Sequence, residues 1–232
     1  KAVLDSYDMA YEEGGHTTER ILRSQLIIKS PGIAPSVPLV AEAAKRGIEI
    51  IDELEFAYRF TSGRIVAITG TNGKTTTTLL TYHFLKEAGL SVGLAGNVGQ
   101  SMAAQLVDGD KDFWVVEMSS FQLDGIRTFR PHIAIIVNIT PDHLDRYDYS
   151  FEKYVASKFR ITKNQSPDEF LIMNSDQVPA HLHKGHIHAH IKEVSLENHE
   201  GMSAWYDDGN MHFDGFTINQ EETVLRGMHN AS

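Results

Sequence analysis

The sequence predicts an α/β protein in which a mostly parallel sheet is covered by helices and ends in antiparallel hairpins. Short apolar runs alternate with helix-length segments, and Gly-marked turns separate them. A continuous apolar run over 64–69 leads through a Gly-containing loop into a helical pattern, as in a parallel βαβ unit. Residues 186–219 instead alternate apolar and polar side chains around two Asp-Gly pairs, which is typical of antiparallel hairpins.

The first sixty residues predict a small α/β part that ends at a hinge. We expect, in order, a strand at 26–28, a helix at 36–46, a strand at 48–51 and a helix at 52–59. The run Thr61-Ser62-Gly63 has the composition of a hinge. We therefore expect a domain boundary there, with one domain over 1–61 and a second over 62–232.

The second part predicts a doubly wound sheet. We expect strands at 64–69, 91–95, 113–116 and 133–137, and helices at 74–88, 99–107 and 150–163. The strands are nearly continuous apolar runs, which suits a parallel sheet covered on both faces. A stretch with five histidines, at positions 181, 183, 186, 188 and 190, raises the alternative of a metal site. Because apolar residues alternate with the later ones, we expect those rings to line one solvated strand face instead.

Composition excludes several classes of protein. Lys and Arg total 21 against 31 Asp and Glu, and the resulting net charge of −10 argues against a nucleic-acid partner, which needs a basic face. The absence of Cys excludes disulfides, thiolate nucleophiles and Cys-ligated zinc. No apolar run approaches the roughly 20 residues that span a bilayer, and the first residues form no signal peptide. We expect a cytoplasmic, monomeric protein without membrane insertion, and, since the first residue is not Met, a part of a longer chain.

The strongest local signal is the segment Gly70-Thr71-Asn72-Gly73-Lys74-Thr75-Thr76, which lies between an apolar strand and a helix. Backbone N–H groups in such a loop converge on an anion, and the helix start adds its positive dipole end. Lys74 would reach the β- and γ-phosphates, and the Thr75 hydroxyl would bind Mg²⁺. The standard phosphate-loop pattern has Gly where this chain has Ile68, so the loop is a shortened variant. The strand–loop–helix placement favours a nucleotide site over a structural turn with an exposed Lys.

Polar residues follow the other predicted strands at their carboxyl ends, where ligands bind in open parallel sheets. Glu117 is placed to bind Mg²⁺ that is held on ATP phosphates. Asn97 is placed to donate to a substrate carbonyl or phosphate, and His143 to bind a second metal or the substrate. Taken singly, the same residues are also compatible with a surface Glu, a turn Asn and a His without a role.

Lys158 falls on the apolar stripe of the helix predicted over 150–163. The stripe consists of Phe151, Tyr154, Val155, Phe159 and Thr162. A Lys on an inward face is uncommon because burying an unpaired ammonium is costly. The alternative is a side chain at the stripe edge that extends to water.

Several segments, in this order, resemble the Mur ligase family, the ATP-dependent amino-acid ligases of peptidoglycan precursor synthesis. They are 70–76, Gly96-Asn97-Val98-Gly99, 117–123, 138–145, Lys158 and Gly227-Met228-His229-Asn230. Within the family, three segments look most like the members that add D-glutamate: the run Ser119-Ser-Phe-Gln-Leu123, the run Asp145-Arg146-Tyr147 after His143, and the upstream Ser30-Pro-Gly-Ile-Ala34.

The resemblance implies a partial N-terminal Rossmann-like domain that binds UDP, over 1–61, and a P-loop ATPase-type central domain over 62–232. A C-terminal amino-acid-binding domain would lie outside this chain. The implied substrates are ATP, UDP-N-acetylmuramoyl-L-alanine and D-glutamate. ATP would phosphorylate the terminal carboxylate, and the amine of D-glutamate would attack the acyl phosphate.

The resemblance also implies roles for individual residues. Catalysis would use Lys74, His143 and a carbamylated Lys158. ATP would contact Gly70, Thr71, Asn72, Gly73, Lys74, Thr75, Thr76, His229 and Asn230. Mg²⁺ would be held by Thr75, Glu117, His143 and Lys158, and the UDP-linked substrate by Asn97, Ser119 and His143.

Three alternatives stay open at this point. Another amino-acid ligase of the same family fits most of the motifs. Folylpolyglutamate synthase is similar, but its loop resembles Gly-Thr-Asn-Gly-Lys-Gly-Ser, where this chain has Thr75-Thr76. A P-loop nucleotide-switch module is a different class, and no Asn-Lys-x-Asp guanine-recognition motif follows the loop to support it.

Overall fold

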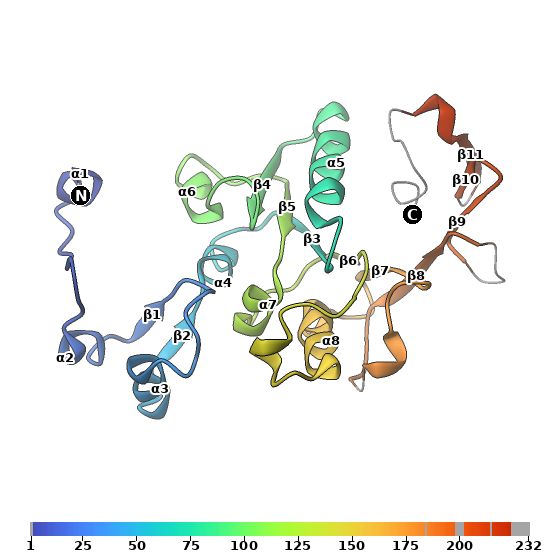
Figure 1. The fold of residues 1–232 in the computed structure, drawn as a ribbon. Coiled ribbons are helices and arrows are strands. Elements are labelled where there is room, and N and C mark those ends of the chain that lie inside the picture. The colour runs from blue at the N-terminus through green and yellow to red at the C-terminus, as the bar shows by residue number, and fades with distance from the viewer. Residues whose placement is uncertain (1, 184, 198–201, 214, 224–232) are drawn as a thin grey trace. The chain divides into compact units, whose positions relative to one another are not determined.

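The computed structural model describes residues 2–183, 185–197, 202–213 and 215–223 (Figure 1). The chain divides into two compact units, Lys1–Asp52 and Glu53–Ser232. This division precedes the expected hinge at 61–63, because the helix that follows Asp52 is fastened to the second unit. Glu53 accepts hydrogen bonds from Ser101 and Ala103, and Glu55 accepts them from the backbone of residues 127–129.

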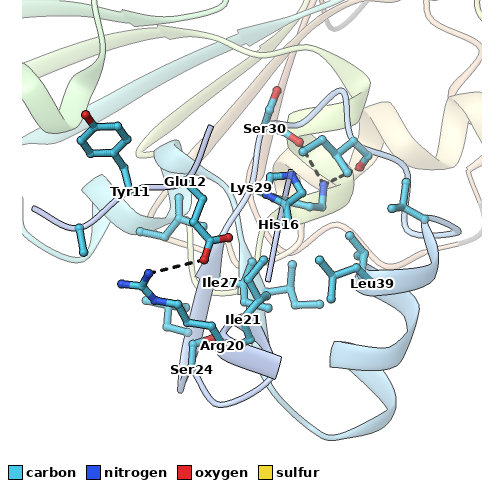
Figure 2. Close-up of a pocket in the computed structure, with 17 residues that line it drawn as sticks. Tyr11, Glu12, His16, Arg20, Ile21, Ser24, Ile27, Lys29, Ser30 and Leu39 are labelled. Atoms are coloured by element: carbon cyan, nitrogen blue, oxygen red, sulfur yellow. Dashed lines mark hydrogen bonds and ion pairs between the residues drawn. The ribbon is translucent and has the colours of Figure 1, made fainter. Parts of the chain in front are cut away.

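The first unit is a small α/β arrangement. Its elements are α1 (Ala2–Ser6), α2 (Thr18–Ile21), β1 (Leu26–Ile28), α3 (Pro38–Lys45) and β2 (Glu49–Ile51). β1 and β2 pair in parallel, with Ile27 opposite Ile50. A pocket of about 560 Å³ opens in this unit, and the residues that line it include Arg20 and Glu12, which form an ion pair of 3.5 Å (Figure 2).

The second unit is built on one nine-stranded sheet in the order β11-β10-β9-β8-β7-β6-β3-β5-β4. Its strands are β3 (Arg64–Thr69), β4 (Val92–Gly96), β5 (Phe113–Glu117), β6 (Ile133–Ile136), β7 (Phe170–Asn174), β8 (His190–Ser195), β9 (Ala204–Asp207), β10 (Asn210–Phe213) and β11 (Phe216–Asn219). Every pair from β4 to β9 is parallel, and the last two pairs are antiparallel. The prediction of a mostly parallel sheet that ends in antiparallel strands is confirmed.

Helices cover both faces of this sheet. They are α4 (Glu53–Tyr58), α5 (Lys74–Glu87), α6 (Met102–Val107), α7 (Ser120–Gly125) and α8 (Phe151–Phe159). Short 3₁₀ turns lie at Leu144–Tyr147, Arg160–Thr162, Ala180–Leu182 and Gln220–Glu222. Along β3, Ile65 and Ala67 pack into a core with residues of α4, α6, α7 and α8, whereas Val66 and Ile68 pack with residues of α5. The alternation explains why β3 is a continuous apolar run.

Two boundaries differ from the sequence expectation for local reasons. α6 begins at Met102 and not at 99, because Gly99 has a φ of +86° and Ser101 caps the helix by accepting from Ala104 N at 3.1 Å. α8 ends at Phe159, and its last predicted turn continues as the 3₁₀ turn Arg160–Thr162.

The prediction for residues 186–219 is partly wrong. β8 runs parallel to β7 and to β9, and the antiparallel pairs among the described strands are β9 with β10 and β10 with β11. The first Asp-Gly pair is confirmed as a hairpin turn, with φ values of 43° at Asp208 and 80° at Gly209. Because β8 begins at His190, His186 and His188 lie outside the strand and do not line its face.

No helix in the described part of the chain is long and apolar enough to cross a membrane.

Candidate active site

The carboxyl ends of four adjacent strands meet at one edge of the sheet. The loop after β3 contacts the segment that follows β6, since Thr71 N donates to Asn138 O at 2.9 Å. The residue after β4 contacts the end of β5, since Asn97 N donates to Glu117 O at 2.9 Å. This edge lies where the strand order reverses around β3, which is the place where open α/β sheets bind ligands.

The loop 70–73 requires glycine at both of its ends. Gly70 has a φ of +157°, and a Cβ there would approach Asn138 O and Val137 Cβ to 3.2 Å. Gly73 adopts the left-handed conformation, with a φ of +77°, directly before α5. The first turn of α5 carries backbone N–H groups without intrahelical partners, and these are available to an anion.

Lys74 lies over the loop that precedes it. Its Nζ donates to Gly70 O at 3.0 Å and to Thr71 O at 2.9 Å. The next two residues, Thr75 and Thr76, are exposed in the first turn of α5. The ammonium and the free amides therefore lie within one helical turn of each other, which is the arrangement that binds phosphate in such loops.

Glu117 is a buried carboxylate with one oxygen left over. Glu117 is only 1% exposed. Oε1 accepts from Asn97 Nδ2 at 2.8 Å, whereas Oε2 has no hydrogen-bond partner in the described part of the chain. An unpaired buried carboxylate oxygen is costly, and a hard cation would satisfy it. The residue therefore fits the role of a Mg²⁺ ligand.

Lys158 is buried against the phosphate loop, as the helical stripe predicted. The residue is 2% exposed, and its Nζ donates to Gly70 O at 2.7 Å and to Thr69 Oγ1 at 3.3 Å. Burial, assisted by the charge of Lys74, lowers the pKa of Lys158 to about 7. Carboxylates of Asp142, Asp124 and Glu117 oppose this shift. An amine with this pKa is neutral in a large fraction of molecules at neutral pH.

His143 lies on the loop after β6, in the left-handed conformation with a φ of 49°. Its side chain is 57% exposed, its Nε2 lies 3.5 Å from Asp142 Oδ2, and its ring packs 5.5 Å from that of Phe121. Among the described residues, no three His, Asp or Glu side chains form a group that can hold a metal ion. Glu117 and His143 therefore do not belong to a metal site made of three protein side chains in the described part of the chain.

Ser119 is engaged in capping α7. Its Oγ accepts from Gln122 N at 3.3 Å and donates to Gln122 Oε1 at 2.9 Å, while Ser119 N donates to the same oxygen at 2.9 Å. The two residues form a capping box. The expected substrate contact by Ser119 would have to share its hydroxyl with this box. His229 and Asn230, the other expected ATP contacts, lie outside the described residues.

Asn138 begins the segment 138–145 that resembles the family, but no local sequence pattern predicts a role for it. The structure places its side chain on the phosphate loop, where Oδ1 accepts from Asn72 N at 2.9 Å. Thr69 was also missed, although its Oγ1 donates to Met118 O and accepts from Lys158. The contacts of Asn138 and Thr69 depend on the register of the paired strands, which no local sequence pattern predicts.

Comparison with known proteins identifies the family of the chain. Residues 68–232 match the model of the Mur ligase middle domain. The chain belongs to the Mur ligase family. The family expected from the motifs is therefore confirmed, over a range that includes the phosphate loop.

Named relatives in the family match almost the whole chain. UDP-N-acetylmuramoylalanine–D-glutamate ligase of Bacteroides fragilis is 46% identical over 235 residues, which are 99% of this chain and 53% of the relative. The ligase of the same name from Porphyromonas gingivalis is 44% identical over 241 residues, with the same coverage. The chain thus spans about half the length of these Mur ligases.

Solved structures of Mur ligases share the fold. The UDP-N-acetylmuramate:L-alanyl-gamma-D-glutamyl-meso-diaminopimelate ligase from Neisseria meningitides matches with a TM-score of 0.66 and 16% identity, over 100% of this chain and 78% of that one. MurF ligase from Thermotoga maritima in complex with ADP matches with a TM-score of 0.54 and 20% identity, over 83% of this chain and 54% of that one. At these identities the likeness concerns the fold alone.

Proposed function

We propose that the full-length protein is an ADP-forming ligase that joins D-glutamate to UDP-N-acetylmuramoyl-L-alanine in peptidoglycan precursor synthesis. The observation that carries the proposal is the 46% identity to a D-glutamate ligase over 99% of this chain. The site supports it independently, because a phosphate loop, a buried carboxylate and a buried lysine lie at one sheet edge. We propose that the reaction takes place in the cytoplasm and that the enzyme is a monomer.

ATP would bind through the loop 70–76 and the first turn of α5. Lys74 lies against the loop, and its ammonium would exchange the two hydrogen bonds to Gly70 O and Thr71 O for hydrogen bonds to phosphate oxygens. These donors stabilise charge as the γ-phosphoryl group passes to the substrate carboxylate. The acyl phosphate so formed is attacked by the amine of D-glutamate, and phosphate leaves. His229 and Asn230 are proposed adenine-side contacts.

Thr75 and Glu117 would hold one Mg²⁺ ion. The buried Oε2 of Glu117 offers an anionic oxygen, and the exposed hydroxyl of Thr75 offers a neutral one. Mg²⁺ accepts one or two such ligands together with phosphate oxygens and water, so three protein side chains are not required. When bound, the ion neutralises charge on the phosphates.

Lys158 would carry a carbamate and act, with His143, towards a second Mg²⁺ ion. A neutral amine is the form that reacts with CO₂, and the pKa of about 7 supplies it at neutral pH. The carbamate nitrogen keeps one N–H, so the hydrogen bond to Gly70 O can persist. The product is an oxygen ligand that suits a hard cation and offsets the charge of Lys74.

The UDP-linked substrate would contact Asn97, Ser119 and His143 from the central unit. We propose that the N-terminal unit Lys1–Asp52 is the rear part of a UDP-binding domain and that the amino-acid-binding domain follows this chain. On this assignment the 232-residue chain by itself makes no amide bond, whatever nucleotide it binds.

A coupled assay of ADP release by the full-length protein tests the proposal. With UDP-N-acetylmuramoyl-L-alanine and ATP present, D-glutamate should start turnover, whereas L-glutamate, L-lysine and meso-diaminopimelate should not. Turnover with an L-amino acid but not with D-glutamate would assign the protein to another ligase of the family. Folate-dependent turnover would indicate a folylpolyglutamate synthase, and a preference for GTP without ligation would indicate a nucleotide switch.

A further inference from the structure

We propose that Asn138 is a positioning residue that fixes the shape of the phosphate loop and turns two of its amides away from the nucleotide. The inference rests on the proposed ATP-dependent function and distinguishes the loop amides that bind Asn138 from the amides that are left to bind phosphate. Asn138 lies two residues beyond the end of β6, the strand that pairs with β3. Its main chain and side chain both contact the loop.

The carboxamide of Asn138 uses its acceptor and its donor on the same loop. Oδ1 accepts from Asn72 N at 2.9 Å and from Thr71 N at 3.2 Å. Nδ2 donates to Asn72 O at 3.0 Å. Asn138 O accepts from Thr71 N at 2.9 Å as well. A primary amide on a short side chain supplies one acceptor and one donor in this geometry, and no hydroxyl or carboxylate supplies both with the same reach.

A second contact fixes the same stretch of chain. Thr71 Oγ1 donates to Thr140 O at 3.0 Å and accepts from Thr140 N at 3.0 Å. Gly70 lies so close to Asn138 that a Cβ would approach Asn138 O to 3.2 Å. Residues 138–140 therefore run along the loop, and we call this segment the brace. Within the brace, the side chain of Asn138 forms three hydrogen bonds to the loop.

The brace determines which amides face a phosphate. The N–H groups of Thr71 and Asn72 donate to Asn138, so they are not directed into the anion site. The first-turn amides of α5, which have no intrahelical partners, and the Lys74 ammonium are left to bind the β- and γ-phosphates. Losing Asn138 would free the loop to adopt other shapes, and ATP binding would have to reorder it.

Titration calorimetry of the full-length protein with Mg²⁺ and ATP tests this role. For Asn138→Ala we expect an ATP affinity at least tenfold weaker and a higher KM for ATP, with the KM for D-glutamate unchanged. Asn164→Ala is the matched control, because Asn164 Nδ2 also donates to two backbone oxygens, of Arg127 at 3.0 Å and Phe129 at 2.8 Å, away from the loop. This control should bind ATP as the native protein does.

Amide hydrogen exchange measured by NMR on the native protein provides a second test that needs no variant. The N–H groups of Thr71 and Asn72 should be protected without nucleotide and should keep that protection when ATP binds. Native ATP affinity in a folded Asn138→Ala protein would overturn the inference. Fast exchange at both amides that becomes slow only with ATP would also overturn it. Absence of ATP binding by the native protein would instead overturn the proposed function, and the exchange measured without nucleotide would still decide the role of Asn138.

Discussion

Asn97 holds Glu117 by two hydrogen bonds across the ends of β4 and β5. Its Nδ2 donates to Glu117 Oε1 at 2.8 Å, and its backbone N donates to Glu117 O at 2.9 Å. Gly96 permits this approach, since a Cβ there would lie 2.1 Å from Glu117 O. One oxygen of the carboxylate is thereby fixed, and Oε2 is left without a hydrogen bond in the described part of the chain.

We expect Asn97→Ala to weaken the binding of the divalent ion. Without the amide, the Glu117 carboxylate loses a hydrogen bond that contributes on the order of 1 kcal/mol and is free to rotate. The Mg²⁺ concentration for half-maximal turnover should rise several-fold, and Mn²⁺ binding beside a non-hydrolysable ATP analogue, followed by electron paramagnetic resonance, should weaken in parallel. If only the KM for the UDP-linked substrate rises, Asn97 acts as a substrate contact and not on Glu117.

We expect Lys74→Ala to abolish most turnover without unfolding the full-length protein. The variant loses a cation that stabilises charge on the transferred phosphoryl group, an effect of about 10²-fold or more in kcat. The matched control is Lys86→Ala, which removes an exposed lysine from the other end of α5, where it lies over the Tyr82 ring. Steady-state ADP release and circular dichroism provide the two measurements. Near-native turnover of Lys74→Ala would contradict the phosphate-loop assignment.

Most of the fold of the second unit follows from local sequence signals. β3 and β5 are continuous apolar runs, and the glycines at 70, 73 and 89 mark the turns around α5. The parallel pairing of β8 with β7 was missed, because alternation of apolar and polar residues indicates only that one face is solvated. Alternation does not distinguish a strand with parallel neighbours, such as β8 between β7 and β9, from a strand of an antiparallel hairpin.

In the candidate site, too, some residues could be predicted from local patterns and others could not. Lys74, Glu117 and Lys158 were predicted from a motif, a strand end and a helical stripe, which are all local patterns. Asn138 acts through hydrogen bonds to a loop 66 and 67 residues earlier in the chain, so its role depends on the register of β6 against β3. The two compact units divide after Asp52, before the predicted hinge at 61–63, because this division depends on which unit binds the carboxylates of α4.

We expect Glu55→Gln to destabilise the second unit by about 2–4 kcal/mol. The Glu55 side chain is fully buried and accepts from the backbone N of Arg127, Thr128 and Phe129 at 2.8–2.9 Å. An amide has one acceptor oxygen, and its NH₂ group would face N–H donors. Urea unfolding followed by tryptophan fluorescence measures the change.

Glu42→Gln is the matched control for this substitution. Glu42, on α3, forms an exposed pair at 2.8 Å with Arg46, the residue after this helix, and such a pair contributes well under about 1 kcal/mol. Equal effects of the two substitutions would show that Glu55 does not anchor α4.

In protein freed of CO₂ and divalent ions, we expect Lys158 to make stability depend on pH. Burial lowers its pKa from 10.5 to about 7 in the folded state, so between these values the unfolded chain holds a proton that the folded chain has lost. Unfolding free energy should therefore rise with pH across this window, by at most about 1.4 kcal/mol per pH unit, relative to Lys158→Met. Urea unfolding at pH 7, 8 and 9 checks the difference, and parallel curves for both proteins would contradict it.

The proposed carbamate on Lys158 leads to a rescue experiment on the full-length protein. Lys158→Ala removes the side chain that reaches Gly70 O and Thr69 Oγ1 and leaves a cavity beside the phosphate loop. If the native group is a carboxylate that binds a cation, a short carboxylic acid such as acetate should enter this cavity and restore part of the activity. If the native group is an ammonium, methylamine should rescue and acetate should not. Lys153→Ala serves as the control, because Lys153 lies on the same helix in an exposed pair with Asp148. Full activity of Lys158→Ala without any additive would rule out a role for the lysine in the reaction.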